Sequence, residues 1–390
     1  MTFNPRNKAA IVGVGKSPFV RDSGKGTVWQ IAQAMKMALD DCGLSHKDLD
    51  GLYVNGGGDF DKMAEQLGLD VVDSTQLWLH GRMSAPTLQM AAHSVISGMA
   101  KYVACVYAID ISERGGGYGG GRSHAWEELR EGGGAHGEMA YYGLTHPGSG
   151  AAMSWRRYMH LYGANEQHLG HVAVSARANA RLNPDALMQA PMTMDDYLAA
   201  RLVIEPLRLF DFAVVNDGAV CVIVSTAERA TDCRKKPIYI AGMEGLHAGR
   251  NEFVFGPPGL GVAQQSVERP AKREHLARRM AGIGTGDVDL FYCLDSFSPI
   301  VIFTLEEHGF CKPGEGAAWF AEGHGTLRGS LPVNTHGGHL SEGMLGSWSH
   351  HVEAVRQLRH ECGERQVPDV KIAQFALGQG VSMIYANEPL

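Results

Sequence analysis

The sequence has 390 residues, of which 44% are hydrophobic and 20% are charged, with a formal net charge of −7. A chain of this length can bury two domain-sized cores. A net negative charge and a pI near 6.2 argue against a basic surface for nucleic acid.

The seven cysteines are scattered singly, without a Cys-x-x-Cys pair. This spacing gives no sign of a disulfide framework or of a thiolate zinc site. The amino terminus carries no signal-peptide pattern, and no apolar run reaches membrane-spanning length. We therefore expect a cytoplasmic protein with no membrane span.

The chain begins with a strand, helix, strand unit. Residues 9–14 form a short apolar run, residues 27–42 have apolar side chains at helical spacing, and residues 48–54 predict a second strand. The Gly15-Lys16-Ser17 triplet resembles part of a phosphate loop. However, the motif requires a glycine where Ala10 stands, and Pro18 opposes the helix start, so we reject that interpretation.

The same unit recurs in the second half of the chain, with a strand at 238–242, a helix at 270–280 and a strand at 287–293. Two tandem α/β copies therefore account for the chain, with their boundary near 231–236. We expect an amino-terminal half, residues 1–232, and a carboxy-terminal half, residues 233–390. Each half is expected to build a mostly parallel sheet, with helices sandwiched between the halves.

Residues 86–100 predict a largely buried helix whose first turn contains Pro86, so Ser84 lies at or next to its start. Free backbone N–H groups and the helix dipole favour negative charge at such a position. Ser84 is therefore either a simple helix cap or a group that takes part in chemistry.

The amino-terminal half contains a glycine-rich insertion, residues 111–165, with three glycine triplets and several aromatic and histidine side chains, among them Tyr142 and His146. A segment of this kind is either a surface loop or a cover over a site. Helices are expected at 154–162 and 165–179, and a strand at 220–225 follows an Asp-Gly turn.

Residues 331–346 form the polar, glycine-rich stretch with the highest density of chemical groups. Glycines let backbone approach a ligand closely, and the neighbouring side chains offer several kinds of donor and acceptor. An ordinary hydrophilic turn is the alternative interpretation. The polar members and the two glycines are Asn334, Thr335, His336, His339, Ser341, Glu342, Gly337 and Gly338.

Over essentially its whole length the chain resembles the thiolase superfamily, in particular the lipid-transfer-like and sterol-carrier-like branch. The most specific similarities are residues 206–219, residues 158–163 and the Asn-Thr-His-Gly-Gly stretch at 334–338. The resemblance implies an α/β protein with a five-layered αβαβα sandwich. It also implies a homodimer or dimer of dimers and coenzyme A thioesters as substrates.

The chemical residues of thiolases are largely replaced in this sequence. Ser84 stands where thiolases have their cysteine nucleophile, and Gln374 stands where they have the second cysteine. Leu294 and Met344 occupy the positions of an oxyanion-binding side chain and of the histidine in the Gly-His-Pro motif. Because serine is far less acidic than cysteine, ordinary thiolase turnover is not expected.

The chain is also similar to the steroid side-chain aldolases, which lack the thiolase cysteine. Such proteins cleave a β-hydroxyacyl-CoA by a retro-aldol reaction and pair with a small zinc-ribbon and OB-fold subunit. They are thought to use tyrosines near the positions of Leu294 and Met344, so those roles do not transfer to this chain.

We therefore predict a thiolase-like enzyme that makes or breaks the carbon–carbon bond β to an acyl-CoA thioester, as an acyltransferase or an aldolase-type lyase. The alternative is an inactive subunit that binds acyl-CoA or lipid, or that scaffolds a partner. A metal site built from His336, His339, His350 and His351 matches no recognised spacing, and we assign no metal. The candidate catalytic residues are His336, His339, Ser84, Glu342 and Tyr142, and the candidate cofactor-binding residues are Gly337, Gly338, Gly378 and Gly380.

Overall fold

A computed structural model describes residues 4–77, 81–110, 147–247, 275–378 and 380–390. Its strands form a nine-stranded sheet in the order β3-β2-β4-β7-β1-β8-β11-β10-β9, and β5 and β6 pair separately. The strands are β1 Ala9–Lys16, β2 Gly51–Val54, β3 Asp73–Gln76, β4 Tyr102–Ile109, β5 Leu202–Ile204, β6 Leu207–Arg208, β7 Gly218–Thr226, β8 Ile238–Glu244, β9 Leu290–Cys293, β10 Ile372–Ala376 and β11 Ser382–Ala386.

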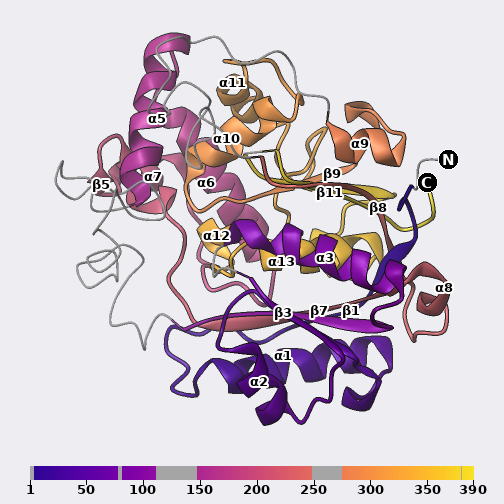
Figure 1. The fold of residues 1–390 in the computed structure, drawn as a ribbon. Helices are drawn as coiled ribbons and strands as arrows, with labels where there is room; N and C mark the ends of the chain where they lie inside the picture. Colours follow the sequence, from indigo (N-terminus) through magenta and orange to yellow (C-terminus); the bar gives the residue numbers. More distant parts are fainter. Residues whose placement is uncertain (1–3, 78–80, 111–146, 248–274, 379) are drawn as a thin grey trace, which may run out of the picture.

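The helices and the two parts of the sheet are stacked in layers (Figure 1). Helices α1 and α2 lie below the strands of the first half, α3 and α13 lie between the two parts of the sheet, and α9, α10 and α11 lie above the strands of the second half. The arrangement is the expected αβαβα sandwich. The helices are α1 Thr27–Cys42, α2 Phe60–Leu67, α3 Ser84–Ser97, α5 Pro147–Tyr162, α6 Glu166–Arg181, α7 Met194–Ala199, α8 Ala227–Ala230, α9 Leu276–Ala281, α10 Ser298–Glu307, α11 Gly316–Ala321, α12 Gly338–Ser341 and α13 Trp348–Leu358.

The prediction of a mostly parallel sheet in each half is wrong. The pairs β2·β3, β2·β4 and β9·β10 are parallel, whereas β4·β7, β7·β1, β8·β11 and β11·β10 are antiparallel. The sequence unit of strand, helix and strand is present, but its two strands are not neighbours: β7 and β4 separate β1 from β2. A short antiparallel contact of β1 with β8, through Ala10 and Ile11, joins the two halves.

Helix α1 packs directly on β1 because two strand positions are glycine. A Cβ atom at Gly13 or Gly15 would overlap the backbone of α1 at Ala38 or Ala34. The apolar stripe of α1 is buried on this surface, and the helix ends at Gly43, whose φ of 78° suits a glycine. This close contact fixes the end of β1, from which Lys16 enters the site.

The two inner helices carry residues of the candidate site. Helix α3 begins at Ser84, two residues earlier than expected, and α13 is buried along nearly its whole length. Both pack into one apolar cluster that includes Leu88, Trp348 and Tyr385. Helix α5 begins at Pro147 rather than near residue 154, so the end of the predicted glycine-rich loop is helical.

Within the described ranges, no helix is long and apolar enough to cross a membrane.

Candidate active site

The stretch 331–346 is not a hydrophilic turn, because all residues from 331 to 350 are buried. Polar side chains that lose contact with water cost free energy unless they find hydrogen-bond partners. The segment is therefore a packed polar site that lies beside the two inner helices.

Ser84 lies at the first position of α3 and contacts α13. Its hydroxyl is 3.1 Å from Nε2 of His351, whose Nδ1 is 2.8 Å from the Tyr385 hydroxyl on β11. Burial holds the pKa of His351 well below its usual range and the pKa of Tyr385 well above it. The three groups therefore form a neutral hydrogen-bonded chain, in which Ser84 is not an anion.

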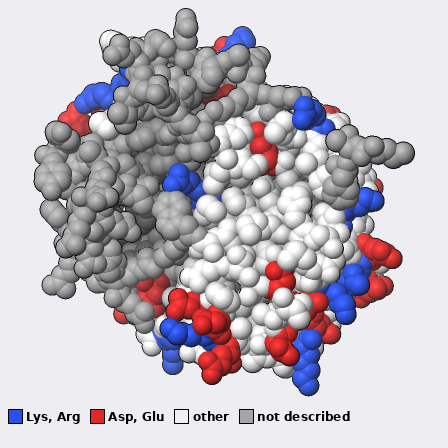
Figure 2. Space-filling model, viewed as in Figure 1, with Lys and Arg blue, Asp and Glu red and all other residues white. Residues whose placement is uncertain are grey.

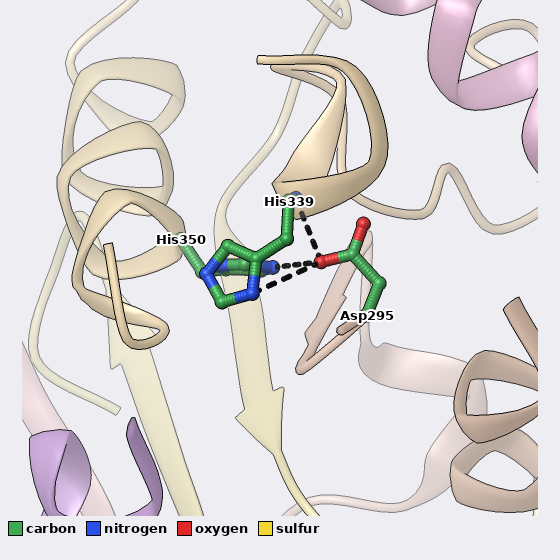
Figure 3. Close-up of side chains that lie close together, drawn as sticks. All are labelled: Asp295, His339 and His350. Atoms are coloured by element: carbon green, nitrogen blue, oxygen red, sulfur yellow. Dashed lines mark hydrogen bonds and ion pairs between the residues drawn. The ribbon is translucent and has the colours of Figure 1, made fainter. Parts of the chain in front are cut away.

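Asp295 accepts a converging set of hydrogen bonds (Figure 3). Its Oδ1 is 2.9 Å from the backbone nitrogen of His339 and 3.1 Å from Nε2 of His350, and Nδ1 of His339 lies 3.9 Å away. Burial alone would raise the pKa of Asp295, but the hydrogen bonds from the His350 ring and from the His339 backbone lower it to about 2. Asp295 is therefore ionised although it is buried.

The atoms of Asp295, His339 and His350 are close enough together to suggest a metal site. The hydrogen bonding of His339 argues against it. Nε2 of His339 accepts the backbone N–H of Ser347 at 3.0 Å, so in the neutral ring the proton is on Nδ1. A protonated Nδ1 cannot coordinate a cation, and it faces the carboxylate as a donor. We therefore interpret the cluster as a carboxylate held by N–H groups.

His336 lies beside the His350 ring and the Glu342 carboxylate. Its ring is edge-on to that of His350, with centroids 4.7 Å apart, and its Nε2 is 3.7 Å from Oε2 of Glu342. Neither ring nitrogen has a hydrogen-bond partner among the described residues. Burial holds the pKa of His336 well below its usual range, so the ring is neutral.

Hydrogen bonds to Oε1 hold the Glu342 carboxylate in place. Oε1 accepts hydrogen bonds from Lys16 and from Asn183, the latter at 2.9 Å, and Lys16 also lies 3.5 Å from Asp185. Asn183 in addition donates to the backbone oxygen of His336 at 2.9 Å. Lys16 and Asn183 therefore fix both Glu342 and the loop that carries His336.

The four candidate glycines lie in two different places. Gly337 and Gly338 have φ values of 102° and 59°, and Cβ atoms there would overlap Ala180 and the Asp295 carboxylate. Their close approach is therefore to protein atoms. Gly378 and Gly380 follow β10, and Gly380, with a φ of 79°, lies against the ring of His247. Tyr142, the remaining candidate catalytic residue, is outside the described residues, as is His146.

At the positions where thiolases carry reactive side chains, this chain has packing groups. Leu294 and Met344 are buried in the central apolar cluster. Gln374 donates to the Ser382 hydroxyl at 3.0 Å and accepts from Arg278 at 3.1 Å. A leucine and a methionine side chain carry no group that can donate or accept a proton, so neither supplies the chemistry of the thiolase residue.

His350 and His351 were considered only as metal ligands, and four further residues of the site were not among the candidates: Asp295, Tyr385, Lys16 and Asn183. The adjacent histidines gave a usable signal, because neighbours on a helix point about 100° apart and so reach two different groups. Lys16 was considered only as part of a phosphate loop. Asp295 lies in the stretch 294–297, which resembles a thiolase motif, but it was not proposed as a site residue. No local pattern marks Tyr385, since its partner is distant in sequence.

Several known proteins resemble this chain in sequence and in fold. A family profile described as "Thiolase C-terminal domain-like" matches residues 264–388. The 17-hydroxy-3-oxo-4-pregnene-20-carboxyl-CoA lyase of Mycobacterium tuberculosis is 34% identical over 360 residues, which cover 90% of this chain and 92% of that protein. The chain belongs to the thiolase superfamily. Within it, this thiolase-like protein falls in the branch that contains the steroid side-chain aldolases and the sterol-carrier-like thiolases.

Two further similarities locate this thiolase-like protein within the superfamily. The steroid side-chain-cleaving aldolase of Thermomonospora curvata is 31% identical over 386 residues, covering 96% of this chain and 95% of that protein. The solved structure "Ltp2-ChsH2(DUF35) aldolase" matches with a TM-score of 0.86 at 30% identity over 100% of both chains. Human mitochondrial 3-ketoacyl-CoA thiolase, at 14% identity and a TM-score of 0.67 over 98% of this chain and 99% of that one, shares the fold.

Proposed function

We propose that this thiolase-like protein is an acyl-CoA lyase that breaks the carbon–carbon bond β to the thioester of a β-hydroxyacyl-CoA by a retro-aldol reaction. The observation that carries the proposal is Ser84, which occupies the thiolase nucleophile position and is hydrogen-bonded to neutral His351. Thiolytic cleavage needs a thiolate at that place, whereas a retro-aldol reaction needs no acyl-enzyme.

The cysteines of the chain support this choice. All seven are within the described residues, and the Ser84 hydroxyl is hydrogen-bonded to His351 rather than to a cysteine. Burial raises the pKa of Cys293, the cysteine nearest the site in sequence, well above its usual range. A buried thiol of this kind stays protonated and is a poor nucleophile.

His336 has the properties of a donor to the enolate that the reaction forms. A neutral imidazole offers one N–H and one lone pair, and both nitrogens of His336 lack partners among the described residues. A fixed N–H beside a developing oxyanion stabilises it without solvent reorganisation. We assign the coenzyme A contact to the turn of Gly378 and Gly380, because Gly337 and Gly338 pack on protein atoms.

We further propose that the active form is a homodimer. Strand β3 is the edge of the sheet, and the face in front of it and of α3 carries few charges over its right-hand part (Figure 2). Val72, Met90 and Met99 are exposed. A second copy that covers such a face would remove both the apolar side chains and the open strand edge from water.

A small zinc-ribbon and OB-fold subunit is the second proposed partner. Its support is the similarity to a solved aldolase whose name includes a DUF35 component. The alternative function, acyl-CoA binding without turnover, is favoured by one observation: Leu294 and Met344 are buried apolar groups at two reactive thiolase positions. The two functions differ in whether any thioester is consumed.

The test is incubation of the purified protein, with and without a co-encoded zinc-ribbon subunit, with matched β-hydroxyacyl-CoA and β-ketoacyl-CoA panels. We expect mass spectrometry to detect a shortened acyl-CoA and a carbonyl product from the β-hydroxy series. Cleavage of the β-keto series alone would support a thiolase instead. Tight binding without cleavage of either series would support the non-enzymatic function.

A further inference from the structure

Besides His339, whose Nδ1 faces Asp295, two buried imidazoles of the site have nitrogen atoms without a hydrogen-bond partner among the described residues. Nδ1 of His350 and both nitrogens of His336 lack hydrogen-bond partners among the described residues, and both side chains are fully buried. The nearby His351 uses both of its nitrogens, on Ser84 and Tyr385. A buried polar atom without a partner costs about 1–3 kcal/mol, so its retention in two adjacent rings indicates a role.

The proton of His350 can be assigned from its neighbour. Asp295 is ionised and therefore only accepts hydrogen bonds, so Nε2 of His350, 3.1 Å from Oδ1, carries the proton. In the neutral ring Nδ1 is then a bare lone pair. This is the arrangement of a general base whose tautomer and orientation are set by a buried carboxylate.

Asp295 is itself held rigidly. It accepts the backbone N–H groups of His339 at 2.9 Å and Leu340 at 3.4 Å, and Gly338 leaves the space in which the carboxylate lies. Nδ1 of His339 faces the same oxygen at 3.9 Å. These contacts stabilise the negative charge and prevent Asp295 from following His350 when the ring changes its protonation state.

We propose that His350 is the general base of the site and that Asp295 is its positioning residue, an inference that rests on the retro-aldol function proposed above. Nδ1 of His350 takes the proton of the β-hydroxyl group, and the O–H electron pair forms the new carbonyl bond. The Cα–Cβ bond breaks, and its electron pair moves to the thioester as an enolate. The proton on His350 is then returned to Cα, which releases the shortened acyl-CoA.

The reaction needs a base for the β-hydroxyl group and a hydrogen-bond donor for the enolate oxygen, and His336 supplies the donor. Its ring is edge-on to His350 at 4.7 Å between centroids, and its neutral N–H can serve the enolate oxygen while His350 serves the hydroxyl. In a β-hydroxy thioester only Cα separates the carbonyl carbon from the carbon that carries the hydroxyl group. The two oxygens can therefore contact two adjacent side chains, one that donates and one that accepts a hydrogen bond.

The test uses His350→Gln and Asp295→Asn in the full chain, with Asp211→Asn as the matched control. Asp211 is also a fully buried carboxylate, but it accepts from Tyr197 at 2.8 Å and from the Arg208 backbone at 2.7 Å, away from the imidazoles. We expect His350→Gln to lower kcat about 10²–10⁴-fold with KM little changed. Asp295→Asn should lower kcat as well, because an amide can present N–H to Nε2 and favour the wrong tautomer. Asp211→Asn should keep the wild-type rate.

A second readout does not depend on the carbonyl product. A base that returns a proton to Cα also removes it, so wild-type protein in D₂O should exchange the Cα hydrogens of the shortened acyl-CoA, and His350→Gln should not. If wild type cleaves and His350→Gln retains the rate and the exchange, His350 is not the base while the lyase function stands. If wild type neither cleaves nor exchanges any acyl-CoA of the panel, the proposed function and this inference both fail. Circular dichroism shows whether each variant is folded. If His350→Gln is unfolded, the kcat of Asp295→Asn tests the proposal in its place.

Discussion

Lys16 and Glu342 form a buried ion pair, although 326 positions separate them in the sequence. The contact connects the end of β1 in the amino-terminal half with the loop that carries His336 in the carboxy-terminal half. A buried charge is tolerated only with a partner and further hydrogen bonds, which Asn183 supplies here. The ion pair therefore fixes the candidate site across the two halves.

Removal of the lysine charge should destabilise the protein. Lys16→Met leaves Glu342 buried without its counter-charge, and we expect a loss of about 3–5 kcal/mol in the free energy of unfolding. Urea denaturation measures this loss. The control is Lys36→Met, which breaks the exposed pair with Asp40 and should change stability by less than about 1 kcal/mol. Equal effects of the two substitutions would show that the buried pair does not stabilise the fold.

A methyl group at Gly338 should disturb Asp295. Gly338→Ala places Cβ on the carboxylate, whereas Gly68, with a similar φ of 65°, has open space around it. Gly68→Ala should therefore cost about 1–2 kcal/mol from backbone strain alone. We expect Gly338→Ala to cost about 1–3 kcal/mol more and to lower turnover. Thermal unfolding and kcat measure both effects, and a Gly338→Ala protein with normal kcat would argue against a rigid Asp295.

Restoring the thiolase cysteine should not restore thiolase activity. In Ser84→Cys the new thiol faces neutral His351, but Leu294 and Met344 remain unable to donate to an oxyanion or to move a proton. We expect no coenzyme-A-dependent cleavage of β-ketoacyl-CoA by this variant. Ser84→Ala is the matched control and should behave in the same way. Appearance of that activity in Ser84→Cys alone would show that the thiolase machinery is intact.

Stability should fall in mild acid because neutral histidines are buried. Burial lowers the pKa of His308 and of His339 to about 3, from an ordinary value of 6.5. Between about pH 6.5 and 3 the unfolded chain binds protons that the folded chain does not, so the free energy of unfolding decreases as pH falls. The expected slope is about 1.4 kcal/mol per pH unit for each histidine.

Urea midpoints at pH 7 and pH 5 check this slope. His308→Gln should make it shallower. A slope that does not respond to His308→Gln would contradict the assignment of a neutral buried imidazole.

The elements with strong local patterns could be predicted from the sequence. Helix α1 has the predicted bounds, and the order of elements in both halves was found by internal comparison. Strand direction could not be predicted, because β1 lies between β7 and β8, which come much later in the chain. Periodicity describes one face of an element and carries no information on its neighbours.

The candidate site was found in part. The density of polar residues near His336 pointed to the buried loop that carries the candidate site, and Ser84 was placed at a helix start. The partners of these groups were missed, since Asp295, Lys16 and Tyr385 reach the site from strand ends and loops that are far apart in sequence. Only the packing of α13 between the two parts of the sheet brings His350 and His351 to their different partners.

The most direct test of the account is cleavage of a β-hydroxyacyl-CoA in the complete absence of free coenzyme A, with all products weighed by mass spectrometry. The retro-aldol function predicts equal amounts of a carbonyl compound and a shortened acyl-CoA, and no mass added to the protein. Cleavage that requires added coenzyme A, or an acyl group attached to Ser84, would contradict it.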